Sequence, residues 1–113
     1  MKEKNPLNVI VTGVGGQGNV LISQLIGKAL VKGGCHVTIG ETYGASQRGG
    51  AVMSHLRISR QEQYGPLIPE GQADVILGLE PVETMRVLAR YDHPGVIVIA
   101  NSRPVYKIGR AHV

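Results

Sequence analysis

Residues 8–18 read Asn-Val-Ile-Val-Thr-Gly-Val-Gly-Gly-Gln-Gly, and this stretch decides the fold. The β-branched run at its start predicts a strand buried on both faces, as in a parallel sheet. The motif Gly-x-Gly-x-x-Gly follows directly and permits a tight turn with close approach of a ligand to the backbone. Residues 19–32 then predict a helix, whose N-terminus would offer free N–H groups to a phosphate.

The rest of the chain continues the same alternation of strands and helices. Residues 51–59 alternate apolar and polar side chains, which predicts an antiparallel or edge strand with His55 on its polar outer face. Strands are predicted at residues 8–12, 36–40, 51–59, 73–79 and 96–100. A second helix is predicted to begin at Glu80-Pro81 and to run to about Tyr91. The predicted inward faces are Val20, Leu21, Leu25, Ile26, Ala29 and Leu30 on the first helix, and Val82, Met85, Leu88 and Ala89 on the second.

These elements predict an α/β fold: a Rossmann-like, three-layer open sheet, mostly parallel, in a single domain over residues 1–113. The segment 101–113 has the character of a continuing chain, so we expect a domain truncated at its C-terminus. No apolar stretch approaches the roughly 20 residues of a membrane span. The N-terminus lacks the apolar core of a signal peptide, and we expect a cytoplasmic protein without membrane contact.

Charge and cysteine content narrow the possible functions. The formal net charge is +4, but the 12 Lys and Arg residues are scattered and form no run that would bind nucleic acid. Cys35 is the single cysteine, so the chain can form neither an internal disulfide nor an iron–sulfur cluster of its own. No histidines have metal-ligand spacing, and no metal site is predicted.

A second glycine-rich loop, residues 41–50, follows the second predicted strand. Arg48 within it is a fork-shaped donor for phosphate or carboxylate. If the first two strands are parallel, both glycine loops lie at the same carboxyl edge of the sheet, where open α/β sheets bind ligands. The predicted ligand-binding residues are Gly13, Gly15, Gly16, Gln17, Gly18, Glu41, Gln47, Arg48, Gly49 and Gly50.

The glycine motif also permits a nicotinamide-dinucleotide interpretation. Glu41 follows Gly18 by 23 residues, near the spacing of a carboxylate that binds the ribose. No hydride-transfer residues accompany it, and a plain loop carboxylate is at least as good an interpretation. Ser54 and His55 are adjacent on a strand and point to opposite faces, so they cannot act as a nucleophile–base pair. No catalytic residue is predicted.

Several motifs, in order and spacing, resemble one family. The chain is similar to the gamma-type domain of 2-oxoacid:ferredoxin oxidoreductases, and within that family to the indolepyruvate type, at residues 11–18, 41–50 and 54–57. The later stretches 66–75, 79–83 and 101–104 agree as well, so that the resemblance covers about residues 8–107.

The resemblance implies a subunit of an enzyme that oxidatively decarboxylates 2-oxoacids to acyl-CoA and reduces ferredoxin. Thiamine diphosphate and the iron–sulfur clusters are then held by a partner subunit, ferredoxin is reached through the complex, and coenzyme A is covered at a shared site. The isolated chain would be inactive, and the family runs to about twice this length. Two other functions stay open from the residues themselves: a stand-alone dinucleotide-binding reductase, and a pure assembly module.

Overall fold

The computed structural model describes residues 5–14, 18–43 and 51–100. The elements, in chain order, are β1 (Leu7–Val14), α1 (Asn19–Lys32), β2 (His36–Tyr43), β3 (Ala51–Ser59), β4 (Val75–Gly78), α2 (Pro81–Tyr91) and β5 (Ile97–Ala100). Their order and type are those predicted from the sequence. The strands β1 and β2 are longer than predicted, so that Glu41 lies within β2 rather than in the following loop.

The strands form one sheet in the order β2-β3-β1-β4-β5. The strand β3 runs antiparallel to both of its neighbours, whereas β1–β4 and β4–β5 are parallel pairs. The antiparallel direction predicted for residues 51–59 is therefore confirmed, but the alternative of an edge position is wrong. The edges are β2 and β5, and the sheet is mixed rather than mostly parallel in its pairings.

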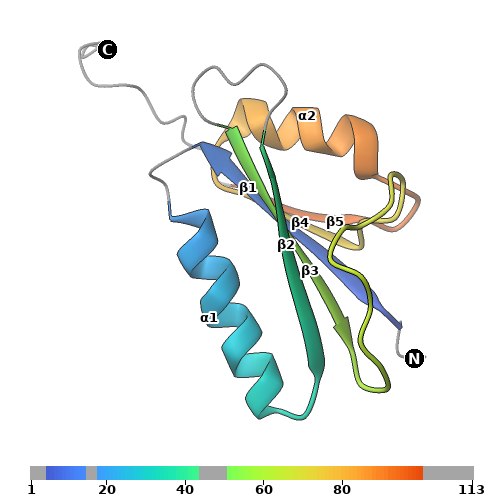
Figure 1. Ribbon diagram of the computed structural model, residues 1–113. Helices are drawn as coiled ribbons and strands as arrows, with labels where there is room; N and C mark the ends of the chain where they lie inside the picture. The colour runs from blue at the N-terminus through green and yellow to red at the C-terminus, as the bar shows by residue number, and fades with distance from the viewer. Residues whose placement is uncertain (1–4, 15–17, 44–50, 101–113) are drawn as a thin grey trace.

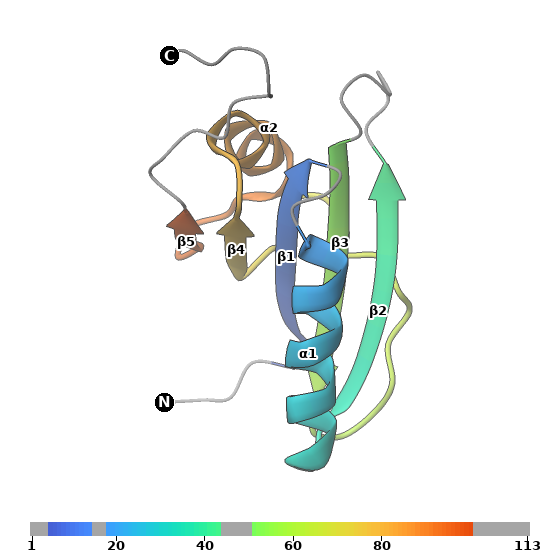
Figure 2. The same ribbon diagram turned by 90° about the vertical axis from the view of Figure 1, so that its left-hand side faces the viewer.

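Among the described residues, one helix covers each face of the sheet, which confirms the three-layer α/β fold. Adjacent residues of β1 belong to different cores: Ile10 packs with Val87 and Tyr91 of α2, and Val11 belongs to the cluster against which Ile26 of α1 packs. Because neighbouring strand residues point to opposite faces, α1 and α2 lie on opposite sides of the sheet. Figures 1 and 2 show the helices on the two sides.

Both faces of the strand β3, which lies between β2 and β1, are buried. Leu56 lies in the core beneath α1, and His55, on the other face, is only 1% exposed. The loop between β3 and β4 covers that second face: Arg57 donates to the carbonyls of Gly65 and Leu67, and the Ile68 amide donates to His55. The predicted outer, polar face of β3 is thus a buried face whose polar groups bind the backbone of a crossing loop.

The inward face of α1 is rotated from the predicted one. Asn19, Ser23 and Gly27 are buried, while Leu21 and Leu25 are 60% and 58% exposed. The cause is a close approach to β2, because a Cβ on Gly27 would lie 3.0 Å from Ile39 Cδ1. Small side chains therefore make the closest approach to the sheet, while Ile22, Ile26 and Leu30 pack against the core beside them. Of the predicted inward residues, Ile26 and Leu30 are confirmed.

The buried face of α2 also differs from the predicted one, because its buried residues are Thr84, Val87 and Tyr91. Val82 and Met85, predicted to face inward, are 57% and 66% exposed. The helix crosses directly over Gly78 of β4, where a Cβ would lie 2.7 Å from Thr84 Cβ. A contact between a glycine and a threonine thus sets the rotation of this helix, and periodicity of the large residues does not reveal it.

Candidate functional site

The two glycine-rich loops leave the sheet at one edge. The strands β1 and β2 run in the same direction, since both are antiparallel to β3. Gly13 at the end of β1 and Tyr43 at the end of β2 both pair with Val52 of β3. The ends of β1 and β2 therefore lie at the same level of the sheet, on either side of β3, and this edge is the candidate site.

The helix α1 begins at this edge with an open N-terminus. Its N-cap is Gly18 in the left-handed conformation, with φ 81° and ψ 16°, and its first turn has neither a capping side chain nor an acidic residue. The N-terminus of α2 differs, because Glu80 caps it by accepting a hydrogen bond from the Glu83 amide at 2.9 Å. Free N–H groups and the positive end of the helix dipole attract anions. Of these two helices, α1 offers the anion-binding terminus.

Three of the predicted ligand-binding residues lie in the described part of the chain. Gly13 is buried in β1, Gly18 caps α1, and Glu41 is exposed in β2. The others lie outside the described residues: Gly15, Gly16, Gln17, Gln47, Arg48, Gly49 and Gly50. Their proposed role depends on the strand ends from which their loops start.

The position of Glu41 bears on the dinucleotide interpretation. In a dinucleotide-binding unit the ribose carboxylate follows the strand next to the glycine turn. Here β3 separates β1 from β2, and Glu41 pairs with Ser54 of β3 rather than with β1. Two strand spacings amount to about 10 Å. The fold therefore does not place Glu41 on the strand beside the glycine turn.

Two polar residues near this edge, Asn19 and Ser54, are not among the predicted site residues. Asn19 Nδ2 donates to the Val52 carbonyl at 3.5 Å, which ties the first turn of α1 to β3. Ser54, fully buried beneath α1, has a hydroxyl with no hydrogen-bond partner among the described residues. The sequence carries a signal for the buried side of α1, since Asn19, Ser23 and Gly27 recur at the spacing of one helix face. They mark the side of α1 that meets the sheet.

His55 is held by two hydrogen bonds and is 1% exposed. Its Nδ1 accepts from the Ile68 amide at 3.1 Å, so the proton of the neutral ring is on Nε2, which donates to Thr42 Oγ1 at 3.2 Å. The ring also meets Tyr91 edge to face, with centroids 5.9 Å apart. Burial, with a contribution from the charge of Arg57, lowers the pKa of His55 from 6.5 to about 4. His55 is thus a neutral structural group that joins β2 and β3 to the crossing loop.

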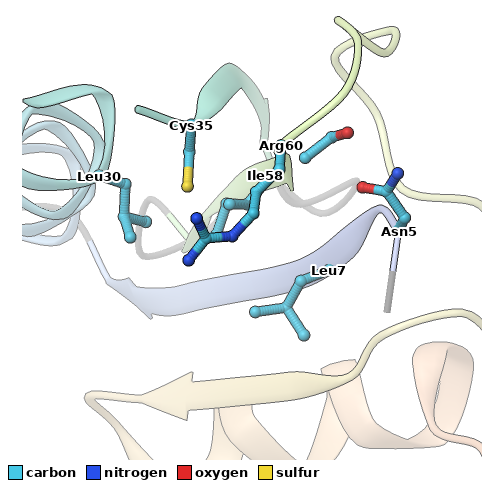
Figure 3. A pocket seen from close by; sticks show the side chains of 7 residues that line it. Asn5, Leu7, Leu30, Cys35, Ile58 and Arg60 are labelled. Carbon is cyan, nitrogen blue, oxygen red and sulfur yellow. The ribbon is translucent and has the colours of Figure 1, made fainter. Parts of the chain in front are cut away.

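A hollow of about 220 Å³ lies at the other end of the strands, away from the ends of β1 and β2 where the glycine-rich loops begin. Figure 3 shows Cys35 and Arg60 on its wall together with the apolar side chains of Leu7, Leu30 and Ile58. These residues lie at the start of β1 and the end of α1, so the hollow is separate from the candidate site, where the two glycine-rich loops begin. Over residues 5–14, 18–43 and 51–100, no group of three or more His, Cys, Asp or Glu side chains is placed to hold a metal ion.

In the described part of the chain, neither α1 nor α2 is long and apolar enough to cross a membrane.

Comparison with known proteins gives a family match over most of the chain. Residues 8–111 match the model of the pyruvate ferredoxin/flavodoxin oxidoreductase family. The chain is 45% identical over 98 residues to the indolepyruvate oxidoreductase subunit IorB of Pyrococcus horikoshii, a match that covers 87% of this chain and 48% of the relative. The same subunit of Thermococcus kodakarensis is 44% identical over 98 residues, with the same coverage. The chain thus spans about half the length of the curated relatives it matches.

Solved structures share the fold. The pyruvate oxidoreductase subunit PORC of Thermotoga maritima superposes with a TM-score of 0.67 at 21% identity, covering 91% of this chain and 53% of that one. The 2-oxoglutarate:ferredoxin oxidoreductase of Magnetococcus marinus, solved with 2-oxoglutarate, coenzyme A and succinyl-CoA bound, gives a TM-score of 0.70 at 22% identity. That match covers 93% of this chain and 18% of the other.

Proposed function

This chain belongs to the pyruvate ferredoxin/flavodoxin oxidoreductase family, and from that premise we propose that it acts as a subunit of a 2-oxoacid:ferredoxin oxidoreductase of the indolepyruvate type. The assembled enzyme oxidatively decarboxylates an aryl pyruvate, forms an acyl-CoA and reduces ferredoxin. The observation that carries this proposal is the 45% identity over 98 residues with an indolepyruvate oxidoreductase subunit.

The chain's part in that enzyme is non-catalytic. A four-cysteine cluster needs ligands that a sequence with one cysteine does not supply. We therefore assign thiamine diphosphate and the iron–sulfur clusters to a partner subunit, and ferredoxin reaches this chain only through the complex. The single cysteine also suits the cytosol, where thiols stay reduced.

The candidate site suits the phosphates of coenzyme A. The open N-terminus of α1, with Gly18 as its cap and no acid in its first turn, fits an anionic group. The loop with Gln47, Arg48, Gly49 and Gly50 joins the end of β2 to the start of β3, the strand beside β1, and would meet the same ligand with the Arg48 guanidinium. Coenzyme A supplies the thiol that takes up the acyl group. This chain holds the cofactor's negative charge while the partner carries the chemistry.

Reconstitution tests the proposal. The chain is purified alone, the thiamine- and cluster-bearing subunit is purified alone, and the two are combined. Acyl-CoA formation and ferredoxin reduction are measured with indolepyruvate, and with 2-oxoglutarate as the comparison substrate. We expect turnover of indolepyruvate by the combined sample only. Full activity of the partner subunit without this chain, or turnover by this chain alone, would contradict the proposal.

A further inference from the structure

The hollow of Figure 3 has walls that come from β1, α1 and β3. Leu7 begins β1, Leu30 lies in the last turn of α1, Ile58 lies near the end of β3, and Cys35 lies between α1 and β2. The same four side chains belong to the core cluster beneath α1. The hollow is therefore an opening into the apolar core, and three elements of the fold hold its walls in place.

The hydroxyl of Ser59 supplies a buried hydrogen-bond donor in this lining. Ser59 is 3% exposed, and its oxygen accepts from the Gln61 amide at 3.0 Å and from the Glu62 amide at 3.2 Å. A hydroxyl that accepts two hydrogen bonds still has its own proton to donate. Within the described ranges, no residue accepts that proton. Ser59 is thus placed to donate to a molecule in the hollow.

Arg60 adds a positive charge beside this donor. Figure 3 shows its guanidinium turned towards Leu30 and Cys35, so the charged head borders the apolar wall. A guanidinium has five N–H donors, and it can keep one partner while two other N–H groups bind a carboxylate. Ser59 and Arg60 are consecutive in the chain, and both present protons to an occupant of the hollow.

The last carbonyls of α1, beside the hollow, are already occupied. The carbonyls of residues 29–31 accept from the backbone amides of residues 33–35. These acceptors are therefore not open to an ammonium group in the hollow, whereas Ser59 and Arg60 offer donors. A carboxylate, which only accepts hydrogen bonds, matches this set of groups.

We propose that the hollow binds a small carboxylate with an apolar body. Apolar walls with a few placed polar groups are typical of small-molecule sites, and about 220 Å³ is below the usual range of roughly 300–1,000 Å³, so the ligand is small. Its apolar body lies against Leu7, Leu30 and Ile58, and its carboxylate meets Ser59 and Arg60. The hollow lies at the other end of the strands from the proposed coenzyme A site, and this inference does not depend on the proposed function.

Calorimetric titration of the full chain with phenylacetate tests the need for both parts of the ligand. Phenethyl alcohol has the same apolar body without the charge, and acetate has the charge without the body. We expect phenylacetate to bind with a Kd of about 1 mM or below, and both comparison compounds to bind at least about tenfold more weakly. Equal affinity for phenylacetate and phenethyl alcohol, or no binding of phenylacetate, would overturn the proposal.

A matched pair of variants tests the role of Arg60. Arg60→Gln and Arg86→Gln each remove one positive charge, and Arg86 is an exposed residue of α2, on the other side of the sheet. We expect Arg60→Gln to weaken phenylacetate binding by about tenfold or more and to leave phenethyl alcohol binding unchanged. Arg86→Gln should change neither. Equal losses in the two variants would mean that net charge, and not the hollow, attracts the carboxylate.

Cys35 reports where phenylacetate binds, because it lines the hollow and is the single cysteine of the chain. The rate of its alkylation by iodoacetamide is measured with and without phenylacetate. We expect the rate to fall in proportion to the fraction of chains that carry phenylacetate, and acetate at the same concentration to leave it unchanged. An unchanged rate at saturation would place phenylacetate outside the hollow and refute the assignment.

Discussion

Replacing Arg48 by alanine is expected to raise the KM for coenzyme A of the assembled oxidoreductase by about 10- to 100-fold, as the loss of one charge-assisted hydrogen bond to a phosphate does. The loop that carries Arg48 joins Tyr43 of β2 to Ala51 of β3. Both ends lie at the edge where α1 begins, beside an N-terminus that no carboxylate caps. Under the proposed function, the Arg48 guanidinium and the N-terminus of α1 both bind the negative phosphates of coenzyme A.

The control for this variant is Arg60→Ala. Arg60 follows β3 at the opposite edge of the sheet, where it borders the hollow of Figure 3. Removing its charge changes the net charge of the chain by the same amount but leaves the candidate site intact. The KM for coenzyme A should then stay near that of the unaltered enzyme. An equal rise for both variants would mean that overall charge, and not a site at the glycine edge, attracts the cofactor.

Acid is expected to destabilise the protein through His55. The folded state holds the pKa of His55 at about 4, below its ordinary value of 6.5. Between these two values the unfolded chain binds a proton that the folded chain does not, so the free energy of unfolding falls as the pH drops from 6.5 towards 4. Over this window the loss is about 2–3 kcal/mol. The causes are the burial of the ring and the nearby charge of Arg57, and a ring protonated on Nδ1 could no longer accept from the Ile68 amide.

Urea unfolding at intervals from pH 7 to pH 4 measures this effect, and His55→Gln is the comparison. Glutamine does not titrate, so the free energy of unfolding of the variant should depend less on pH between 6.5 and 4. At pH 7 it should be lower than that of the unaltered protein. At pH 7 the variant should lose about 1–3 kcal/mol, since the Ile68 amide or the Thr42 hydroxyl loses a buried partner. Parallel pH profiles for the two proteins would show that other groups cause the acid sensitivity.

Much of the fold is predictable because the signals are local. The glycine turn between a β-branched run and a helix fixes β1 and α1, and Glu80-Pro81 marks the start of α2, where Glu80 caps the helix. Alternation over 51–59 gives the bounds of β3, and of the two predicted alternatives, an antiparallel or an edge strand, the antiparallel one is correct. Each of these signals needs only neighbouring residues, and each is confirmed.

The position of β3 and the facing of the helices depend on contacts that are distant in sequence. His55 and Arg57 look like solvent-facing residues, yet both bind the backbone of the loop that crosses their face. Gly27 and Gly78 admit close contacts with β2 and α2, and these contacts rotate α1 and α2 away from their most apolar faces. Periodicity reports where apolar residues gather, whereas a glycine contact decides which side of a helix can come close.

The sequence predicts at which strand ends the candidate site lies, but it does not predict the contacts that the residues there make. The shared direction of β1 and β2 places both glycine loops together, and that direction follows from a helical crossover between them. The insertion of β3 does not follow, and it is the feature that removes Glu41 from the strand beside the glycine turn. Asn19 and Ser54 belong to recognisable sequence patterns, but these patterns do not reveal that Asn19 donates to the Val52 carbonyl or that the Ser54 hydroxyl has no partner among the described residues.

Under the proposed function, the edge at which β1 and β2 end forms half of a coenzyme A site that a partner subunit completes. Equilibrium dialysis of coenzyme A and of NADH against the isolated chain, the isolated thiamine-bearing subunit and their complex tests it most directly. We predict that the complex binds coenzyme A at least about tenfold more tightly than the partner alone, and that the isolated chain binds neither ligand tightly. Tight binding of NADH by the isolated chain, or equal affinity of the complex and the partner for coenzyme A, would contradict the claim.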